Sequence, residues 1–330
     1  MNRSSVHWRI CRFISRFGWK GELMTVDYCR DPWDANVLNA RSGHRMEFPE
    51  AIIGEVQGWI DRRPDVVDDE VEQSDVVELE QLNQLARRVR VELTEGTGVA
   101  RVLPPGDVDD LFLRRYYLAF GVLLGDPLGN YGRLYDVKDR GGDYTKTAIP
   151  VSQTRAATGL HTDSSALDVL PDLVGLMCIR PAKSGGASRI ACALRAHQRL
   201  VEEDAKSLSV LQQPHLRDIV TPGADRSQRM RNQFPVFGDQ SGRGVTCRYM
   251  RFWIEKGYEN AGVTVPEGLI ESLDALDGYL EEEGAVANFR LQRGEMLWVD
   301  NCTTLHDRTG YEDDPDAPRL LLRQWVKYLR

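Results

Sequence analysis

The sequence lacks several features that would assign it to a familiar class of protein. Its 330 residues include six cysteines, none of them in a Cys-x-x-Cys pair, so the spacing predicts neither a disulfide framework nor a zinc ribbon. No apolar run reaches the roughly 18–20 residues that a membrane span needs. The formal net charge is −8, which disfavours nucleic acid as a partner. These absences predict a cytoplasmic globular protein and leave a homo-oligomer open.

The first 23 residues form a basic segment in which arginine and lysine alternate with aromatic and aliphatic residues. We interpret residues 1–23 as an extension, not native or not ordered, ahead of a natural start at Met24, or as a packed terminal helix. The alternative is an amphipathic surface anchor. The segment lacks the continuous apolar core of a secretory signal. Residues 24–330 are predicted to form a single domain.

The first part of that domain has helical periodicity. Ile52, Ile53, Val56 and Ile60 recur at spacings of three and four, which predicts a helix over residues 50–63. Leucines 79, 82 and 85 with Val89 predict a second helix, and residues 108–124 a third that ends at Gly125. Residues 92–103 are interpreted as a loop that enters a short strand. The helical part therefore spans about residues 50–125.

From about residue 130 the pattern changes to short β-rich segments separated by Gly, Pro and Asp. This texture is typical of an antiparallel sheet fold. Two helices interrupt it, one over residues 193–212 and one that begins near Pro266 and ends at Gly284. The predicted strands are residues 131–137, 173–179, 187–192, 248–253, 287–291, 296–299 and 320–326. The predicted fold class is mainly β with flanking helices.

One short motif has the residue types of a metal site. In His161-Thr162-Asp163 the imidazole and the carboxylate share one face of an extended strand, because side chains two apart point the same way. With a distant histidine, His306, the set becomes two histidines and one carboxylate. That set is the facial triad of non-haem Fe(II) oxygenases, which leaves coordination positions open. A His-x-Asp motif also recurs by chance, so the residues after His306 matter.

Two arginines follow in the last predicted strand. Arg319 and Arg323 are four residues apart, so both would point to the face of the strand that Leu321 shares. Inside a β-rich fold two guanidinium groups are costly unless they meet anions. A guanidinium matches a carboxylate bidentately, so a dicarboxylate is a natural partner. The alternative is a surface strand with two solvated arginines.

Four ordered motifs carry a family resemblance. They are His161-x-Asp163, the stretch Arg180-Pro-Ala-Lys-Ser-Gly-Gly-Ala-Ser188, the stretch Arg293-Gly-Glu-Met-Leu-Trp-Val-Asp-Asn301 before His306, and Arg319 thirteen positions later. In this order, residues 90–330 resemble the taurine-dioxygenase-like (TauD/TfdA, clavaminate-synthase-like) family of Fe(II)/2-oxoglutarate oxygenases. The resemblance implies a double-stranded β-helix, a cupin-like jelly-roll, as the core over about residues 130–330.

The same resemblance implies roles for individual residues. His161, Asp163 and His306 would ligate Fe(II), and Arg319 would pair with the far carboxylate of the cosubstrate 2-oxoglutarate. Ser188 stands where the family usually has a threonine that binds this carboxylate. Arg323 would lie nearer the substrate pocket or support Arg319. Oxygen is the second cosubstrate, and succinate and CO2 are released.

Two departures from the family bear on the substrate. Leu160 stands where sulfonate-oxidising members have tryptophan, and Gly-Gly-Ala-Ser replaces Gly-Gly-Asp-Thr. These changes disfavour a taurine-like substrate, whereas Asp163 disfavours a halogenase. The candidate substrate contacts are Arg323, Ser164 and Arg251, the last placed with Tyr249 on one face of the strand over residues 248–253.

Several other residues receive weaker expectations. Asp300 and Asn301 would orient His306 or form a turn, and Cys302 is expected to point away from the metal into the core. The remaining histidines are interpreted as surface or cap residues (His7, His44, His197 and His215).

The leading hypothesis is a hydroxylase that acts on an unactivated C–H bond of a small polar molecule, such as an amino acid or a natural-product intermediate. Desaturation, epoxidation or cyclisation with the same cofactors is the first alternative. A zinc hydrolase would need a general-base carboxylate beside the metal and would leave Arg319 unexplained. A cupin-like, non-catalytic metal- or ligand-binding protein is the alternative of another class.

Overall fold

A seven-stranded sheet, the major sheet, forms the centre of the computed structural model, which describes residues 11–15, 24–146, 149–218, 232–239 and 242–328. Its strand order is β3-β4-β15-β7-β18-β5, with β6 also paired to β18. The β3–β4 pair is parallel and the other pairs are antiparallel. The strands are β3 (Arg45–Met46), β4 (Val99–Val102), β5 (Asp126–Pro127), β6 (Tyr135–Val137), β7 (Leu173–Arg180), β15 (Met296–Asp300) and β18 (Leu320–Lys327).

A smaller sheet, the minor sheet, packs against one face of the major sheet. It has the order β14-β9-β16, with β14 (Ala287–Phe289), β9 (Ser188–Cys192) and β16 (Thr304–Arg308). Because side chains alternate along a strand, odd and even positions serve different layers. Leu321 and Trp325 of β18 join Ile190 of β9 in one buried cluster between the sheets. The inner face of β18 is therefore the face of its odd-numbered residues.

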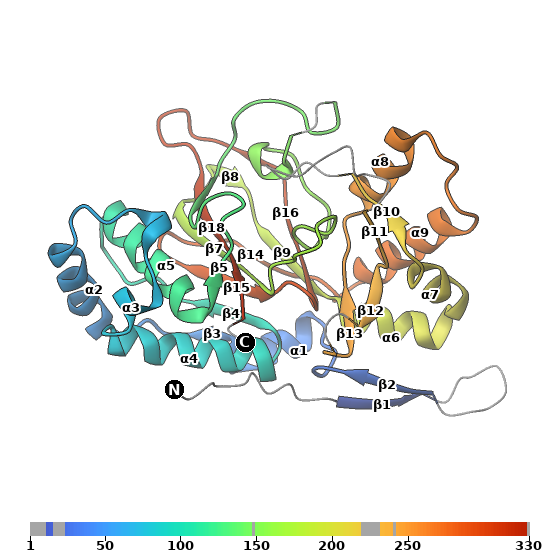
Figure 1. Cartoon of the computed structure of the whole chain (residues 1–330), viewed down its shortest axis with the longest axis horizontal. Coiled ribbons are helices and arrows are strands. Elements are labelled where there is room, and N and C mark those ends of the chain that lie inside the picture. Colours follow the sequence, from blue (N-terminus) through green and yellow to red (C-terminus); the bar gives the residue numbers. More distant parts are fainter. Residues whose placement is uncertain (1–10, 16–23, 147–148, 219–231, 240–241, 329–330) are drawn as a thin grey trace.

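The even-numbered residues of β18 face a layer of helices. Leu322 and Val326 belong to a cluster with residues of the N-terminal helices, which lie to the left of the sheets in Figure 1. Gln324 Nε2 donates to Tyr117 O at 2.7 Å. A Cβ at Gly121 would lie 1.5 Å from Gln324 Oε1, so glycine permits this close approach. The helices of this layer are α2 (Ala51–Arg62), α3 (Gln73–Val76), α4 (Glu80–Glu95) and α5 (Asp110–Leu124).

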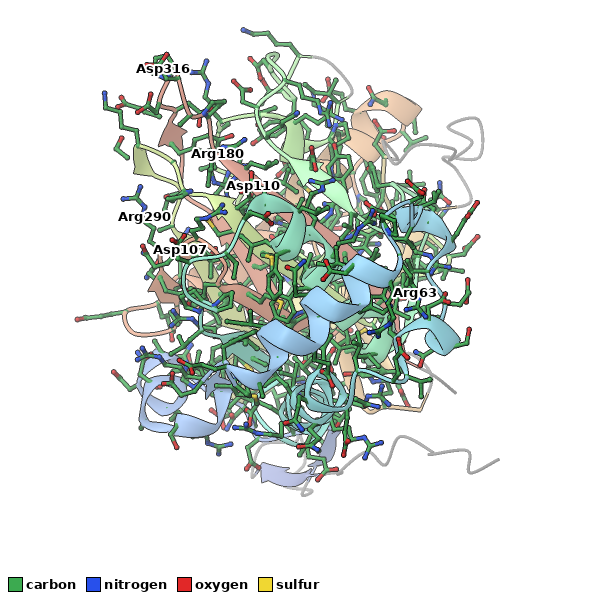
Figure 2. All side chains as sticks on the ribbon, turned by 90° about the vertical axis from the view of Figure 1, so that its left-hand side faces the viewer. Arg63, Asp107, Asp110, Arg180, Arg290 and Asp316 are labelled. Atoms are coloured by element: carbon green, nitrogen blue, oxygen red, sulfur yellow. The ribbon has the colours of Figure 1, made fainter. Side chains whose placement is uncertain are left out.

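The N-terminus of α5 is tied to the end of β7. Asp109 caps the helix through the amide of Phe112 at 2.7 Å, as Asp does at helix starts. Asp110 forms an ion pair with Arg180 at 3.3 Å, and Figure 2 shows both residues close together near the surface. An exposed ion pair of this kind adds at most about 1 kcal/mol to stability. The position of α5 is therefore set mainly by the buried contact between its apolar residues and the major sheet.

A second helical layer covers the outer face of the minor sheet, to the right in Figure 1. Leu305 of β16 and Ala191 of β9 pack with leucines of these helices. The layer contains α6 (Ala193–Glu203), α7 (Ala205–Leu211), α8 (Arg251–Ala261) and α9 (Leu269–Leu280). The remaining elements are α1 (Ala35–Ala40), β1 (Cys11–Ser15), β2 (Met24–Tyr28), β8 (Ser184–Gly185), β10 (His215–Leu216), β11 (Gln233–Phe234), β12 (Phe237–Asp239), β13 (Val245–Cys247) and β17 (Tyr311–Glu312).

Several predicted elements are confirmed, among them the helices over residues 50–63 and 108–124 and the strands over 173–179 and 320–326. Residues 248–253 are not a strand: α8 begins at Arg251. Its buried residues Trp253, Ile254, Gly257 and Tyr258 have helical spacing, and the interpretation as a strand followed the aromatic content of this segment instead.

Three other boundaries differ from expectation. Residues 92–95, predicted as a loop, are the last turn of α4, and β6 covers only the end of the predicted 131–137 strand. The helix expected over 193–212 breaks at Asp204, whose side chain caps α7 through the amide of Ser207 at 3.0 Å. In the N-terminal segment, Cys11–Ser15 form a strand antiparallel to β2. The rest of residues 1–23 lies outside the described residues.

None of the helices in the described part of the chain is both long enough and apolar enough to cross a membrane.

Candidate metal centre

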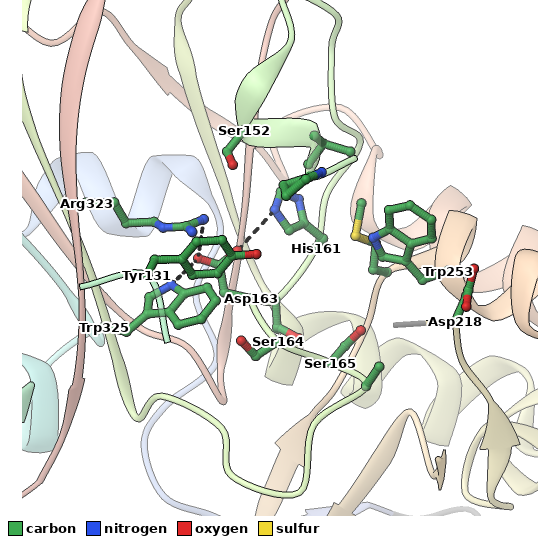
Figure 3. Close-up of a pocket in the computed structure, with 15 residues that line it drawn as sticks. Tyr131, Ser152, His161, Asp163, Ser164, Ser165, Asp218, Trp253, Arg323 and Trp325 are labelled. Atoms are coloured by element: carbon green, nitrogen blue, oxygen red, sulfur yellow. Dashed lines mark hydrogen bonds and ion pairs between the residues drawn. The ribbon is translucent and has the colours of Figure 1, made fainter. Parts of the chain in front are cut away.

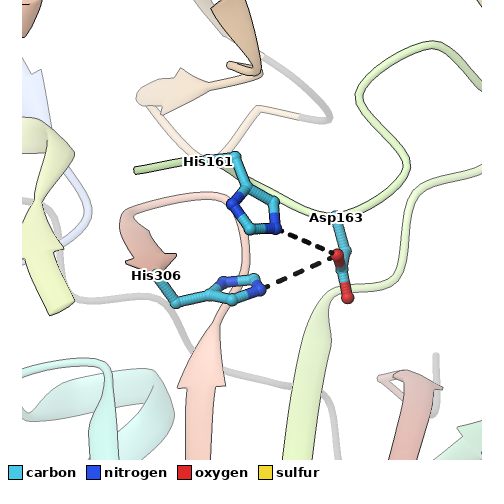
Figure 4. A group of neighbouring side chains, drawn as sticks. All are labelled: His161, Asp163 and His306. Atoms are coloured by element: carbon cyan, nitrogen blue, oxygen red, sulfur yellow. Dashed lines mark ion pairs between the residues drawn. The ribbon is translucent and has the colours of Figure 1, made fainter. Parts of the chain in front are cut away.

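Three of the predicted residues converge at one point between the two sheets. His161, Asp163 and His306 are all buried, and one ligand atom from each lies within 4.8 Å of the others. Figure 4 shows both imidazoles directed at the same carboxylate oxygen. His161 Nε2 lies 3.6 Å from Asp163 Oδ1, and His306 Nε2 lies 3.7 Å from the same atom. These are the separations of atoms that surround a common point, and they fit one metal ion.

The backbone brings the two histidines together although 145 positions of sequence separate them. His161 N donates to His306 O at 3.0 Å, and His306 N donates to His161 O at 2.9 Å. This bridge continues the pairing along the edge strand β16. His161 Nδ1 lies 2.8 Å from Gly159 O, which fixes the tautomer with the proton on Nδ1 and leaves the Nε2 lone pair directed inward.

The peptide of Asp163 is held by Asn301. Asn301 Oδ1 accepts from Asp163 N at 2.8 Å, and Asn301 Nδ2 donates to Asp163 O at 3.1 Å and to Pro171 O at 3.1 Å. Asn301 is fully buried. The expectation that Asn301 orients His306 is wrong: it orients the carboxylate residue. Asp300 has the turn role, since its carboxylate accepts from Cys302 N at 2.9 Å and pairs with Arg30 at 2.6 Å.

The two oxygens of the Asp163 carboxylate have different environments. Oδ2 accepts from Trp325 Nε1 at 2.6 Å and lies 3.4 Å from Arg323 Nη1, as the dashed lines in Figure 3 show. Oδ1 faces the two imidazoles. Burial alone would raise the pKa of Asp163, but the Arg323 guanidinium and the two imidazoles hold the pKa well below its usual range. The group is therefore an anion, as a metal ligand must be.

A first cavity runs from the three residues toward Arg319, and we call it the inner pocket. Its walls include His161, Asp163, His306, Ser188 and Arg319. Arg319 is 4% exposed, and its Nη1 has no hydrogen-bond partner among the described residues. The guanidinium lies 4.8 Å from the centroid of the Tyr311 ring, and burial lowers its pKa. A buried cation in this state is a binding site for an anion.

A second cavity opens on the other side of the three residues, and we call it the outer pocket (Figure 3). Arg323 lines it, stacked 4.4 Å from the Trp325 ring and 5.0 Å from that of Tyr131. Arg323 Nη2, Ser152 Oγ and Ser164 Oγ have no hydrogen-bond partner within the described residues. Ser164 has a φ of 59°, a left-handed conformation that is rare for serine and clusters at functional sites.

Arg251 is not part of either pocket. Its guanidinium lies 2.7 Å from Asp274, 2.9 Å from Asp277 and 2.7 Å from Glu255, in the outer helical layer. Its predicted neighbour Tyr249 is buried and donates to Asp277 at 2.6 Å. The prediction failed because residues 248–253 do not form the expected strand.

Three of the other histidines, His44, His197 and His215, are buried, although surface or cap positions were predicted for them. His197 Nδ1 bonds the Tyr28 hydroxyl at 3.0 Å, His215 Nε2 bonds Val210 O at 2.8 Å, and His44 Nδ1 bonds Arg41 O at 2.6 Å. His7 lies outside the described residues. Cys302 is buried and lines a separate cavity with Asp172 and Arg243, so it points away from the metal site as expected.

Two important residues were missed or misassigned by the sequence patterns. Trp325 is two positions after Arg323 in a strand, so the period of two already placed it on the same face. Its contact with Asp163 spans 162 positions and had no local sign. The contact between Asn301 and Asp163, which are 138 positions apart, likewise has no local sign in the sequence.

The family model described as taurine catabolism dioxygenase TauD, TfdA family matches residues 63–325. FR-33289 synthase of Streptomyces rubellomurinus is 27% identical over 265 residues, which cover 76% of this chain and 75% of that protein. A uridine-5′-phosphate dioxygenase of a Streptomyces species is 30% identical over 181 residues, 53% of this chain and 63% of the relative.

Among solved structures, asparagine oxygenase superposes with a TM-score of 0.67 at 19% identity over 87% of this chain and 94% of its own. A complex of that oxygenase contains Fe(II), 3-hydroxyasparagine and succinate. The likeness shows a shared fold, a mixed sheet flanked by helices.

Proposed function

The chain belongs to the taurine catabolism dioxygenase TauD, TfdA family and is an Fe(II)- and 2-oxoglutarate-dependent dioxygenase; we propose that His161, Asp163 and His306 hold its iron. We further propose that the two sheets form a double-stranded β-helix with this site between them. Five buried free cysteines among the described residues support a reducing, cytoplasmic setting.

The donor set fits Fe(II). Two neutral imidazole nitrogens and one carboxylate oxygen face a common point, and this combination with open positions is characteristic of Fe(II) oxygenase sites. Asp163 Oδ2 is engaged by Trp325, so one oxygen of this carboxylate is directed at the metal. When bound, the iron supplies O2 activation coupled to decarboxylation of 2-oxoglutarate to succinate and CO2. The side chains supply binding, orientation and exclusion of side reactions.

We assign 2-oxoglutarate to the inner pocket. Its far carboxylate would meet the guanidinium of Arg319 and the hydroxyl of Ser188. Its keto-acid end would lie at the other end of the pocket, at the metal position beside His161, Asp163 and His306. The observation that supports this placement is the buried Arg319 Nη1, which has no partner in the described residues. Two parallel N–H···O bonds from a guanidinium fit a carboxylate. The tight turn ahead of Ser188 depends on Gly185, where a Cβ would lie 2.2 Å from Gly310 O.

We assign the substrate to the outer pocket, where Arg323 and Ser164 would bind an anionic group. Three polar atoms of this pocket, on Arg323, Ser152 and Ser164, lack partners within the described residues. The names of these proteins fit a substrate with an anionic group, because uridine-5′-phosphate carries a phosphate and asparagine a carboxylate. We propose hydroxylation of a C–H bond of such a small polar molecule, an amino acid or a natural-product intermediate. Desaturation, epoxidation or cyclisation would need the same iron site and another substrate placement.

The class of reaction is tested without knowing the substrate. Under anaerobic conditions, Fe(II) and 2-oxoglutarate added to the metal-free protein should produce the weak visible charge-transfer band of a keto acid chelated to iron. His161→Ala should lose the band, whereas Arg251→Ala, whose side chain is outside both pockets, should keep it. Absence of the band in the parent protein, together with tight zinc binding, would contradict the proposal.

A further inference from the structure

The hydrogen bond between Trp325 and Asp163 is unusually well placed for controlling a metal ligand. A free carboxylate can offer a metal either oxygen or both. Here Trp325 Nε1 lies 2.6 Å from Oδ2, while Oδ1 lies 3.6 Å and 3.7 Å from the imidazole nitrogens of His161 and His306. The donor therefore engages the oxygen that faces away from the two histidines. Figure 3 shows the indole directed at this carboxylate.

We propose that Trp325 is a positioning residue that restricts Asp163 to one-oxygen binding of the metal, an inference that rests on the proposed iron site. A facial triad needs three protein atoms so that the remaining positions stay open. If Asp163 rotated and bound through both oxygens, it would take one of these positions. The Trp325 N–H opposes that rotation because Oδ2 would have to leave a short hydrogen bond inside a buried site, where an unpaired donor costs about 1–3 kcal/mol.

The indole is suited to this task because neighbouring side chains hold its position. Trp325 is 6% exposed, the Tyr131 ring meets it edge-on at 5.0 Å, and the Arg323 guanidinium stacks on it at 4.4 Å. Its N–H can only donate and carries no charge, so it binds Oδ2 at any pH at which the protein is folded. Asn301 fixes the peptide of Asp163 at the same time. The backbone and the carboxylate of the ligand thus have separate supports.

Arg323 is the second group near Oδ2, but the geometry favours Trp325 for this role. Its Nη1 lies at 3.4 Å, longer than a good charge-assisted hydrogen bond of about 2.7–2.9 Å. Its Nη2 has no partner in the described residues and lines the outer pocket. With Oδ2 held by the indole, the guanidinium can turn to a substrate anion without releasing the metal ligand.

The test compares two tryptophans. Trp325→Phe keeps an aromatic ring and removes the donor. Trp298→Phe is the matched control, because Trp298 is fully buried, packs on Tyr117 and Phe120, and its Nε1 has no partner among the described residues. Both variants and the parent would be titrated anaerobically with Fe(II), and separately with Co(II) as a spectroscopic probe. Thermal unfolding of the metal-free proteins would report the packing cost of each change.

Loss of an outer partner of a metal ligand typically weakens metal affinity about 10- to 100-fold. We expect a loss of this size, and an altered Co(II) spectrum, in Trp325→Phe but not in Trp298→Phe. If Trp325→Phe does not fold, benzothienylalanine at position 325, which has the shape of tryptophan without its N–H, makes the same comparison.

Two results would overturn the inference. One is metal affinity within about twofold of the parent in Trp325→Phe, a change too small for loss of such a partner. The other is an equal loss in both tryptophan variants, which would assign the effect to packing. If the parent itself binds neither metal, the proposed iron site fails, and the inference with it.

Discussion

Replacement of Arg319 by methionine should have opposite effects on stability and on cosubstrate binding. Arg319 is 4% exposed, and its Nη1 has no hydrogen-bond partner among the described residues. Burial lowers the pKa of Arg319, because the nearby Tyr311 and Asp313 offset only part of the cost of burying its charge. Methionine fills much of the same volume and removes the charge. We expect the metal-free, cosubstrate-free variant to be more stable than the parent by about 1–3 kcal/mol, the typical cost of an unpaired buried polar group.

The same change should nearly abolish binding of 2-oxoglutarate. Removing one partner of a buried charge pair costs about 2–5 kcal/mol. Since each 1.4 kcal/mol corresponds to about a factor of ten, the dissociation constant should rise from about 30-fold to several thousand-fold. Arg319→Lys keeps the charge but loses the bidentate fork, so its affinity for 2-oxoglutarate should lie between that of the parent and that of the methionine variant.

The assay is urea unfolding of parent, Arg319→Met and Arg251→Met with and without 2-oxoglutarate and Fe(II). Ligand binding to the folded state raises its stability, so one set of curves reports both quantities. Arg251→Met is the control, because that guanidinium pairs with Asp274, Asp277 and Glu255 outside the pockets. A destabilised Arg319→Met variant that is still fully stabilised by 2-oxoglutarate would refute the placement of the cosubstrate.

Three further predictions concern the rest of the site and the core. Arg323→Gln should raise the KM for an anionic substrate about 10- to 100-fold, because it removes a charge-assisted hydrogen bond of about 1.5–3 kcal/mol. The rates of succinate release with the substrate and with its neutral ester should then differ less than in the parent. An unchanged ratio of these two rates would contradict the assignment of Arg323 to the substrate anion. Asn301→Leu should lower the free energy of unfolding, measured with urea, by about 2–4 kcal/mol, because it leaves the peptide groups of Asp163 unpaired in the interior. An unchanged free energy of unfolding would show that water replaces the amide. Burial lowers the pKa of His197 to about 4, so as the pH falls this histidine is protonated in the unfolded chain before it is protonated in the folded protein. The free energy of unfolding should therefore fall by up to about 3 kcal/mol between about pH 6.5 and about pH 4. His197→Gln should lack that part of the decline, and curves of stability against pH that run parallel for variant and parent would refute the prediction.

The sequence patterns picked out the three residues that the structure brings together, because their spacing follows local rules. His161 and Asp163 are two apart, and Arg319 and Arg323 are four apart, so the period of two predicted that each pair shares a face; in the structure Arg319 directly precedes β18 and an irregularity separates it from Arg323. The structure brings both pairs to the same pocket wall. The helices over residues 50–63 and 108–124 were predictable for a similar reason, since their apolar stripes have the helical period.

What failed depended on contacts between distant parts of the chain. Residues 248–253 have the aromatic content of a strand, but α8 begins at Arg251; Ile254 and Tyr258 face the core of the outer layer, and Trp253 lines the outer pocket. His197 and His215 carry no mark of burial in the sequence, because their partners Tyr28 and Val210 belong to other elements. Local propensity is a weak prior where tertiary packing decides.

Strand β18 and the residue before it line both pockets and contact the Asp163 carboxylate. Its odd-numbered residues Arg323 and Trp325 point between the sheets, and Arg319, which directly precedes the strand, lines the inner pocket. A slip of one residue against β7 would turn Arg323 and Trp325 toward the helices. The even-numbered Gln324 opposes such a slip, because its amide donates to Tyr117 O in a space left open by Gly121. The contact lies on the outer face of the strand and touches neither pocket, yet it fixes the register on which the alignment of Arg323 and Trp325 depends.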